Sequence, residues 1–441
     1  MRAFIQRLSN SSNYPKVMEW GKMISITGGA QLFVQLTSFA SGILCIRLLS
    51  TQEYAFFVLA NTMLGTMTML ADSGITNGVM AESGKVWQDR NKLGDVIATG
   101  LNLRRQFGLV SLLATMPLLG YLLITHGASW LMMALIMLAI IPAFFAAQSD
   151  ALYAIVPRLH QNIKPLQKNE IEVSLARVIL NALLLLVFPY TFIALIANGI
   201  PRIYGNHRLK ELSIRDANKD GVSDPLVRKA IIKGVSRTLP IVIYHCISGQ
   251  ISIWLISFFG TTNSISQIGA LGRMAVGFTV FSSLFSTLVV PRFARLDSNK
   301  QQLLKRFLLI QVLTFLISLI LLFSIWLFSD QILWVLGKNY YGLNYELLLV
   351  GIINCIGLIG GVCSQLVLSR GWFLKPYFLI GLNFFSTVIS VTFINVSSLV
   401  GVLYFTIAVS IMAYLMDVIY GLTSINKIRW INKSVDSSKK L

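Results

Sequence analysis

Charged residues are scarce in this sequence. Only 12% of its 441 residues are charged, 55% are hydrophobic, and the mean hydropathy is +0.69. A soluble globular domain carries about 25% charged residues, so the composition excludes an ordinary water-soluble protein. The apolar residues fall in runs of about 20, the length that crosses a hydrocarbon core about 30 Å thick. We therefore predict an all-α polytopic membrane protein, since a β-barrel would show short alternating segments instead.

Cysteine and histidine are also scarce, with four of each. The cysteines all lie in apolar runs, with no Cys-x-x-Cys pair and no histidine at ligand spacing: Cys45, Cys246, Cys355 and Cys363. We expect no disulfide framework and no metal site. Phosphate-binding loops, Gly-x-Ser-x-Gly and His-Glu-x-x-His are missing as well. These absences favour a transporter without cofactors, driven by an ion gradient or by substrate supply, over an enzyme.

Twelve apolar stretches are long enough to cross a membrane. We predict spans at 23–46, 54–80, 107–125, 130–156, 171–187, 189–205, 238–259, 264–290, 307–328, 345–368, 376–395 and 400–422. A basic middle segment separates two halves of six spans, an organisation common in transporters. The predicted domains are an N-terminal lobe (1–205), a cytoplasmic linker (206–237), a C-terminal lobe (238–422) and a basic cytoplasmic tail (423–441).

The basic residues are distributed unevenly around these spans. With the N-terminus in the cytoplasm, inward segments hold 33 of the 37 Lys and Arg, while outward loops hold only Arg47 and Lys338. Arg177 and Arg273 lie inside spans. Cytoplasmic loops of membrane proteins carry an excess of Lys and Arg, so we predict that both termini are cytoplasmic. The net charge of +19 then needs no nucleic acid partner.

The linker ends in an amphipathic segment. Asp224 and Pro225 are typical of a helix cap and first turn. Apolar residues follow on one face and basic residues on another: Leu226, Val227, Ile231, Ile232 and Val235 against Arg228, Lys229, Lys233 and Arg237. This pattern predicts an interfacial helix that leads into the seventh span.

Several spans carry polar residues on one helical face. Gln31 and Gln35 recur in the first span, and Asn61 and Asp72 in the second. A charge near mid-bilayer costs at least ~2.5 kcal/mol on insertion scales, so Asp72 and Arg273 are expected to face a water-filled cavity between the halves. The small and hydroxyl residues of the same stripes suit helix packing equally well.

These residues suggest two roles. Arg binds phosphate as a bidentate fork, and amides can pair with sugar hydroxyls, so we expect substrate contacts from Arg273, Gln31, Gln35, Asn61, Arg177 and Gln250. Candidates for ion coupling are Asp72, His245 and Asp417. For Arg177, Asp150 and Asp417, which lie nearer the cytoplasmic ends of their spans, and for His245, a packing role stays the favoured alternative.

Four short motifs resemble one family. They are Arg47-Leu48-Leu49-Ser50-Thr51-Gln52-Glu53-Tyr54-Ala55 after the first span, Leu70-Ala71-Asp72-Ser73-Gly74-Ile75, Pro291-Arg292-Phe293-Ala294-Arg295, and Leu333-Trp334-Val335-Leu336-Gly337-Lys338-Asn339-Tyr340. Their order and spacing over the whole chain resemble the Wzx-type O-antigen flippases of the multidrug/oligosaccharidyl-lipid/polysaccharide exporter superfamily. The chain departs from the family pattern at Ala55, often Gly, and at Gln250, near an acid in many members.

The resemblance implies a V-shaped, MATE-like fold of two six-helix lobes in a bacterial inner membrane. It implies a substrate of undecaprenyl-pyrophosphate-linked oligosaccharide, flipped from the cytoplasmic to the periplasmic leaflet, with membrane lipids, an O-antigen polymerase and a chain-length regulator as possible partners. Alternatives left open are a MATE-type cation-coupled exporter, a lipid II flippase, a membrane-embedded O-antigen polymerase and a structural subunit. The outward loops, at most about 16 residues long, argue against a polymerase.

Overall fold

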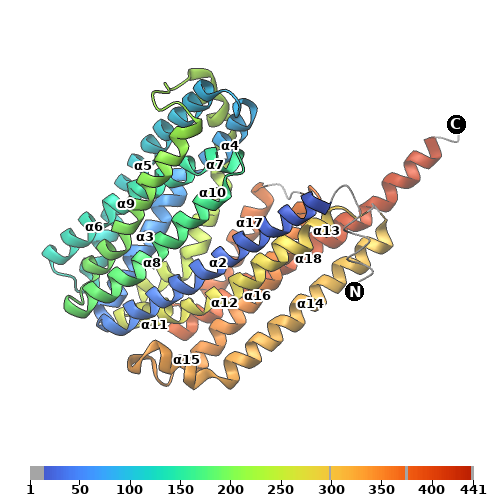
Figure 1. The fold of residues 1–441 in the computed structure, drawn as a ribbon. Coiled ribbons are helices and arrows are strands. Elements are labelled where there is room, and N and C mark those ends of the chain that lie inside the picture. Colours follow the sequence, from blue (N-terminus) through green and yellow to red (C-terminus); the bar gives the residue numbers. More distant parts are fainter. Residues whose placement is uncertain (1–13, 297–298, 373–375, 439–441) are drawn as a thin grey trace. The chain divides into compact units, whose positions relative to one another are not determined.

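The computed structural model describes residues 14–296, 299–372 and 376–438, and these residues contain helices and no strands (Figure 1). The all-α prediction is therefore confirmed. In chain order the helices are α2 (Tyr14–Leu48), α3 (Thr51–Asp72), α4 (Ile75–Val86), α5 (Arg90–Thr125), α6 (Trp130–Tyr153), α7 (Ile155–Leu159), α8 (Ile163–Val187), α9 (Thr191–Asp216), α10 (Pro225–Phe259), α11 (Thr262–Leu271), η1 (Gly272–Met274), α12 (Ala275–Leu284), η2 (Phe285–Val289), α13 (Val290–Ala294), α14 (Lys300–Leu327), α15 (Ser329–Leu336), η3 (Lys338–Tyr340), α16 (Asn344–Ser369), α17 (Pro376–Phe393) and α18 (Leu399–Ser438).

Each predicted span falls on a helix or on a run of short helices. In the described part of the chain, eight helices are long and apolar enough to cross a membrane. Many also expose apolar side chains: on α14, Leu308, Val312, Phe315, Leu319 and Phe323 form an exposed stripe at helical spacing. Lipid covers such stripes in a membrane protein, and the chain is a multi-pass membrane protein. The total of twelve spans stays a prediction.

The second span is broken where the sequence suggested one helix. α3 ends at Asp72, and Ser73 and Gly74 have positive φ angles of 43° and 88° before α4 begins. A left-handed backbone interrupts an α-helix and is easiest for glycine. The break leaves Asp72 at a helix end, where its carboxylate accepts a hydrogen bond from the backbone N–H of Thr76 at 3.1 Å.

The eighth span is also irregular. It starts as α11, tightens to a 3-10 turn at η1, continues as α12, widens to a π-helix at η2 and ends as α13. Such changes in the hydrogen-bond register often occur at functional positions. Arg273 lies in the 3-10 turn.

The third span begins much earlier than residue 107. Asp89 caps α5 by accepting hydrogen bonds from the backbone N–H groups of Asn91 and Lys92, at 3.1 and 3.2 Å. A carboxylate is a strong helix cap because it satisfies free N–H groups. The predicted cytoplasmic loop before residue 107 is therefore mostly helical, and Arg104 lies about four turns inside α5.

The predicted linker is short in the structure. α9 continues to Asp216, and α10 runs without interruption from Pro225 to Phe259. Ile231 and Val235 are buried in a core cluster with residues of α4 and α5, including Val79. The apolar face at the start of α10 therefore packs on other helices, in contrast to the predicted interfacial helix, while Leu226 stays exposed.

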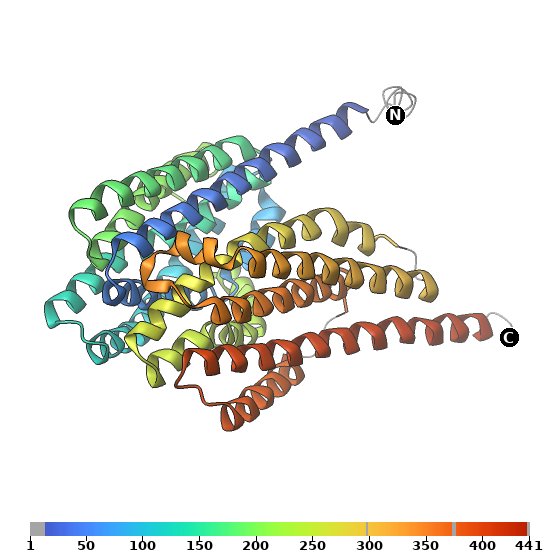
Figure 2. The same cartoon turned by 90° about the horizontal axis from the view of Figure 1, so that it is seen from below.

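The chain divides into two compact units. The first contains the residues up to Leu49 and Met63–Ile243, and the second contains Ser50–Thr62 and the residues from Tyr244 onward. In the first unit α9 packs against α6 and α8, α2 against α8, and α5 against α6; in the second, α16 packs against α14 and α18 (Figures 1 and 2). The first half of α3 belongs to the second unit, which the sequence did not indicate. The domain boundaries at 205 and 238 stay a prediction.

Candidate functional site

A buried arginine joins four helices of the first unit. The Arg104 guanidinium on α5 donates hydrogen bonds to the Asp72 carboxylate at the end of α3, to the Thr76 hydroxyl on α4 at 2.7 Å, and to the Gln148 carbonyl on α6. The Arg104 side chain is 8% exposed and that of Asp72 is 32% exposed. In a low-dielectric interior each charge depends on the other, because removing one leaves the second uncompensated.

The same site holds polar atoms without partners. Within the described residues, Arg104 Nε and Gln148 Nε2 are buried and make no hydrogen bond. Gly108 lies directly beside Gln148, since a Cβ at Gly108 would come within 2.1 Å of Nε2. The glycine therefore lets α5 and the Gln148 side chain approach closely.

A second ion pair lies between α6 and α9. Asp150 accepts hydrogen bonds from Arg202 Nε at 3.2 Å and from Asn206 Nδ2 at 2.6 Å. Asn206 also donates to the Ser149 hydroxyl at 2.7 Å. Arg104 is close enough for its charge to act on Asp150. The two ion pairs thus form one polar network within the first unit, which we call the Arg104 network: Asp72, Thr76, Arg104, Gln148, Asp150, Arg202 and Asn206.

Arg177 adds a further cation next to this network. Its side chain on α8 is half-buried, and its guanidinium has no hydrogen-bond or ion-pair partner among the described residues. The charge of Arg202 acts on Arg177. With Arg104, Arg177 and Arg202 against Asp72 and Asp150, this part of the first unit keeps one positive charge in excess.

The second unit holds a second cation of this kind. Arg273 is half-buried in the 3-10 turn, and it has no hydrogen-bond or ion-pair partner in the described part of the chain. Gln250 on α10 is half-buried as well. Asp417 on α18 accepts a hydrogen bond from Ser364 on α16. His245 lies on α10, but its side chain is outside the described residues.

The remaining predicted substrate residues are the three amides. On α2, Gln31 is exposed and Gln35 is half-buried. Asn61 donates to the Phe57 carbonyl on its own helix at 2.8 Å. Gln31, Gln35 and Arg177 belong to the first unit, whereas Asn61, Gln250 and Arg273 belong to the second. Neither unit alone brings all six predicted substrate residues together, and their role stays a prediction.

The sequence reading missed most of the Arg104 network. It counted both Arg104 and Arg202 among the residues of cytoplasmic loops, and it did not anticipate the Asp72–Arg104 and Asp150–Arg202 pairs. One signal was present: Asp89 is a helix-capping residue, and a helix that starts there carries Arg104 into the membrane. The pairing of residues on different helices has no such local signal.

Solved structures are similar to this chain, whereas the comparisons of its sequence found no match. No protein-family model and no curated protein matches it. Among solved structures, it is similar to the inward-facing conformation of a multidrug resistance MATE family transporter of the MOP superfamily, with a TM-score of 0.73 and 14% identity over 90% of this chain and 95% of that chain. The outward-facing conformation of a MATE family transporter gives a TM-score of 0.57 and 15% identity, over 91% and 94%.

A third similar structure is described by the polarity of its binding pocket. It is a MOP superfamily transporter from Pyrococcus furiosus, described by a reverse polarity of its binding pocket that suggests a different function. Its TM-score is 0.58 and its identity 15%, over 92% of this chain and 96% of that chain. At such identities the likeness concerns the fold. This chain therefore has the fold of the MATE transporters of the MOP superfamily.

Proposed function

We propose that this protein is a flippase that moves an undecaprenyl-pyrophosphate-linked oligosaccharide from the cytoplasmic to the periplasmic leaflet of a bacterial inner membrane by alternating access. Similarity to both inward-facing and outward-facing transporters supports alternating access. The four motifs of the polysaccharide-export flippases favour a lipid-linked glycan as the substrate.

The polarity of the unpaired charges carries this proposal. In the described spans, the cations Arg177 and Arg273 have no partner, whereas the acids Asp72 and Asp150 are each paired with an arginine. A buried charge without a partner is costly, so a site with spare cations suits an anionic ligand that neutralises them. A pyrophosphate meets this need, since Arg binds phosphate oxygens in a bidentate way.

The proposed cycle assigns a role to each predicted residue. The sugar and pyrophosphate head enters the substrate site while the prenyl tail stays in the bilayer. Arg273, assisted by Arg177, neutralises phosphate, and Gln31, Gln35, Asn61 and Gln250 pair with sugar hydroxyls. Asp417 takes up the coupling ion, with Asp72 and His245 as further candidates. An O-antigen polymerase and a chain-length regulator act on the product.

The second candidate function is a MATE-type cation-coupled exporter of small molecules. The structural neighbours favour it, because they include multidrug resistance transporters. Export of an organic cation requires an acid that is not already neutralised. Asp417 has no cationic partner in the described part of the chain, and it is bonded to Ser364. Glu346 has none there either, but it lies in the first turn of α16, at the end of its span. Arg177 and Arg273, which have no partner among the described residues, favour an anionic substrate and thus the flippase.

Deletion of the gene in its host tests the proposal. We expect surface glycan to be lost, with single lipid-linked repeat units retained on the cytoplasmic leaflet, and the wild-type gene to restore it. Single units that reach the outer leaflet without lengthening would indicate a polymerase. Unchanged glycan with new sensitivity to cationic dyes would indicate a drug exporter.

A further inference from the structure

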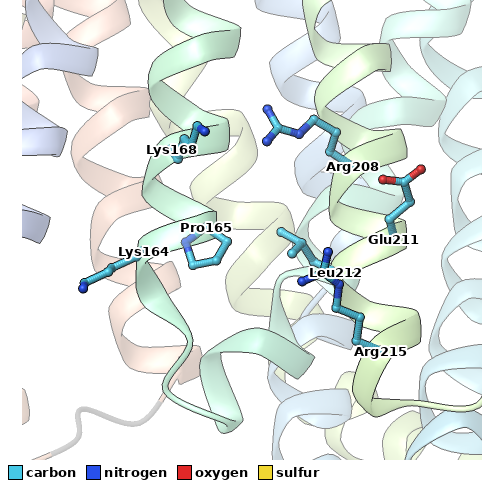
Figure 3. A pocket seen from close by; sticks show the side chains of 7 residues that line it. All are labelled: Lys164, Pro165, Lys168, Arg208, Glu211, Leu212 and Arg215. Atoms are coloured by element: carbon cyan, nitrogen blue, oxygen red, sulfur yellow. The ribbon is translucent and has the colours of Figure 1, made fainter.

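A basic groove lies between α8 and α9 (Figure 3). It has a volume of about 310 Å³ and is lined by Lys164, Pro165, Lys168, Arg208, Glu211, Leu212 and Arg215. Arg208 projects toward Lys168 across the groove, and the Arg215 guanidinium reaches back beside Leu212 (Figure 3). Ligand pockets start at about 300 Å³, so the groove has room for a small polar group.

The charges of the groove select an anion. Four cations line it against one acid, Glu211, which points away from α8 in Figure 3 and pairs with His207 at 3.3 Å. Glu172, just outside the lining, is bonded to Arg208 and lies 3.8 Å from Lys168. With both acids counted, two positive charges are left for a ligand. Because Arg and Lys both bind phosphate, a phosphate group is the most suitable ligand.

The surface next to the groove indicates that this phosphate belongs to a lipid. On α9, in the two turns before Arg208, Ile200, Ile203 and Tyr204 are 50%, 44% and 57% exposed. On α8, in the three turns after Lys168, Leu175 and Ile179 are 44% and 48% exposed. The Arg208 guanidinium lies 5.9 Å from the centre of the Tyr204 ring. Tyrosine is enriched at the level of the headgroups. A basic groove thus continues directly into an apolar surface.

We propose that this groove is a binding site for the headgroup of an anionic phospholipid, whose acyl chains lie along the exposed apolar residues of α8 and α9. In the proposed orientation the groove faces the cytoplasmic leaflet, where basic residues at the membrane surface bind anionic lipids. The site does not depend on which substrate the protein carries. It is a contact with the surrounding bilayer that holds the α8–α9 end of the first unit at the headgroup level.

Native mass spectrometry of the full-length protein in detergent tests this site. The probes are phosphatidylglycerol and phosphatidylcholine with identical acyl chains. We expect phosphatidylglycerol to be retained preferentially. The variant K168Q/R215Q, which keeps the Arg208–Glu172 pair, should weaken its binding about 25-fold, because each basic residue near a membrane surface contributes roughly fivefold. The control K210Q/K229Q removes two exposed cations outside the groove and should change binding less than about twofold.

Three results would overturn the proposal. The first is that the protein retains phosphatidylglycerol and phosphatidylcholine equally, and the second is that both double variants lose the same amount of phosphatidylglycerol binding. The third is that millimolar inorganic phosphate displaces phosphatidylglycerol and is itself seen bound to the protein. The last result would assign the groove to a soluble phosphate. Thermal unfolding of both variants, measured in parallel, ensures that lost binding reflects the groove and not an unfolded protein.

Discussion

Arg104 on α5 donates a hydrogen bond to the Asp72 carboxylate at the end of α3, with only 8% of the arginine side chain exposed. Thr76 completes the contact, since its hydroxyl accepts from Arg104 at 2.7 Å and donates to Asp72 at 2.5 Å. The break between α3 and α4 makes this arrangement possible, because it places Asp72 and Thr76 around one end of the arginine.

The first prediction concerns the stability of this pair. Asp72→Asn or Arg104→Gln alone should each destabilise the protein by about 3 kcal/mol, because each leaves a buried charge uncompensated. The double variant should be more stable than the sum of the two losses predicts, by about 1 kcal/mol or more. A thiol-reactive fluorophore in a thermal ramp can measure this, since all four cysteines are free and buried. Strictly additive losses would mean that the two side chains do not interact.

The second prediction concerns Arg273. Because this side chain has no partner among the described residues, Arg273→Ala should leave membrane levels and thermal unfolding unchanged. Surface glycan should fall about tenfold or more, since removing one partner of a charged phosphate contact costs about 2 kcal/mol or more. Arg273→Lys keeps the charge but loses the fork, so it should restore part of the glycan. Undiminished surface glycan in Arg273→Ala would remove Arg273 from the substrate site.

The third prediction separates Asp417 from Asp72. Asp417 has a hydroxyl partner and no arginine, so Asp417→Asn should leave the folded protein as stable as wild type within about 1 kcal/mol. It should abolish the dependence of transport on an imposed ion gradient in vesicles. Asp72→Asn should instead lower the free energy of unfolding by about 3 kcal/mol, because it leaves the buried charge of Arg104 uncompensated. Gradient-dependent transport that persists in Asp417→Asn and is lost in a still folded Asp72→Asn protein would reverse the assignment.

The fourth prediction concerns the close approach of α5 to the segment before α10. A Cβ on Gly94 would lie 2.5 Å from the backbone oxygen of Asn218 and 3.0 Å from its nitrogen. Gly94→Ala should therefore destabilise the protein by about 2 kcal/mol, since backbone atoms yield little to overpacking. Gly84→Ala in α4 is the matched control: nothing lies within 4 Å of its Cβ, and it should be neutral or stabilising by up to about 1 kcal/mol. The same cysteine-exposure measurement compares the two, and equal melting temperatures would refute the contact.

Hydropathy was enough to predict the helical membrane class, because a span needs only length and apolar composition. It failed at the ends and breaks of helices. Composition alone predicts a long loop before residue 107, although Asp89 is a helix-capping residue and indicates that α5 starts next to it. The break at Gly74 and the 3-10 turn at Arg273 depend on backbone geometry that apolar runs do not reveal.

The candidate site was harder to predict than the fold. Helical spacing places residues on a face but does not say which helix that face meets. Asp72 and Arg104 are 32 residues apart, and Asp150 and Arg202 are 52 apart, so both pairs depend on tertiary packing. The sequence therefore led us to expect Arg104 in a cytoplasmic loop, whereas in the structure its buried side chain lies at the centre of the network.

The most direct test of the flippase proposal is transbilayer movement in a reconstituted system. Purified protein is placed in vesicles with a fluorescent undecaprenyl-pyrophosphate-linked oligosaccharide, and a membrane-impermeant reductant is added outside. We predict that wild-type protein exposes the label of the inner leaflet to the reductant, so that fluorescence is lost completely, and that Arg273→Ala slows this loss. If the inner label stays as protected as in protein-free vesicles, while an organic cation crosses the same membranes, the flippase account is contradicted and a drug exporter takes its place.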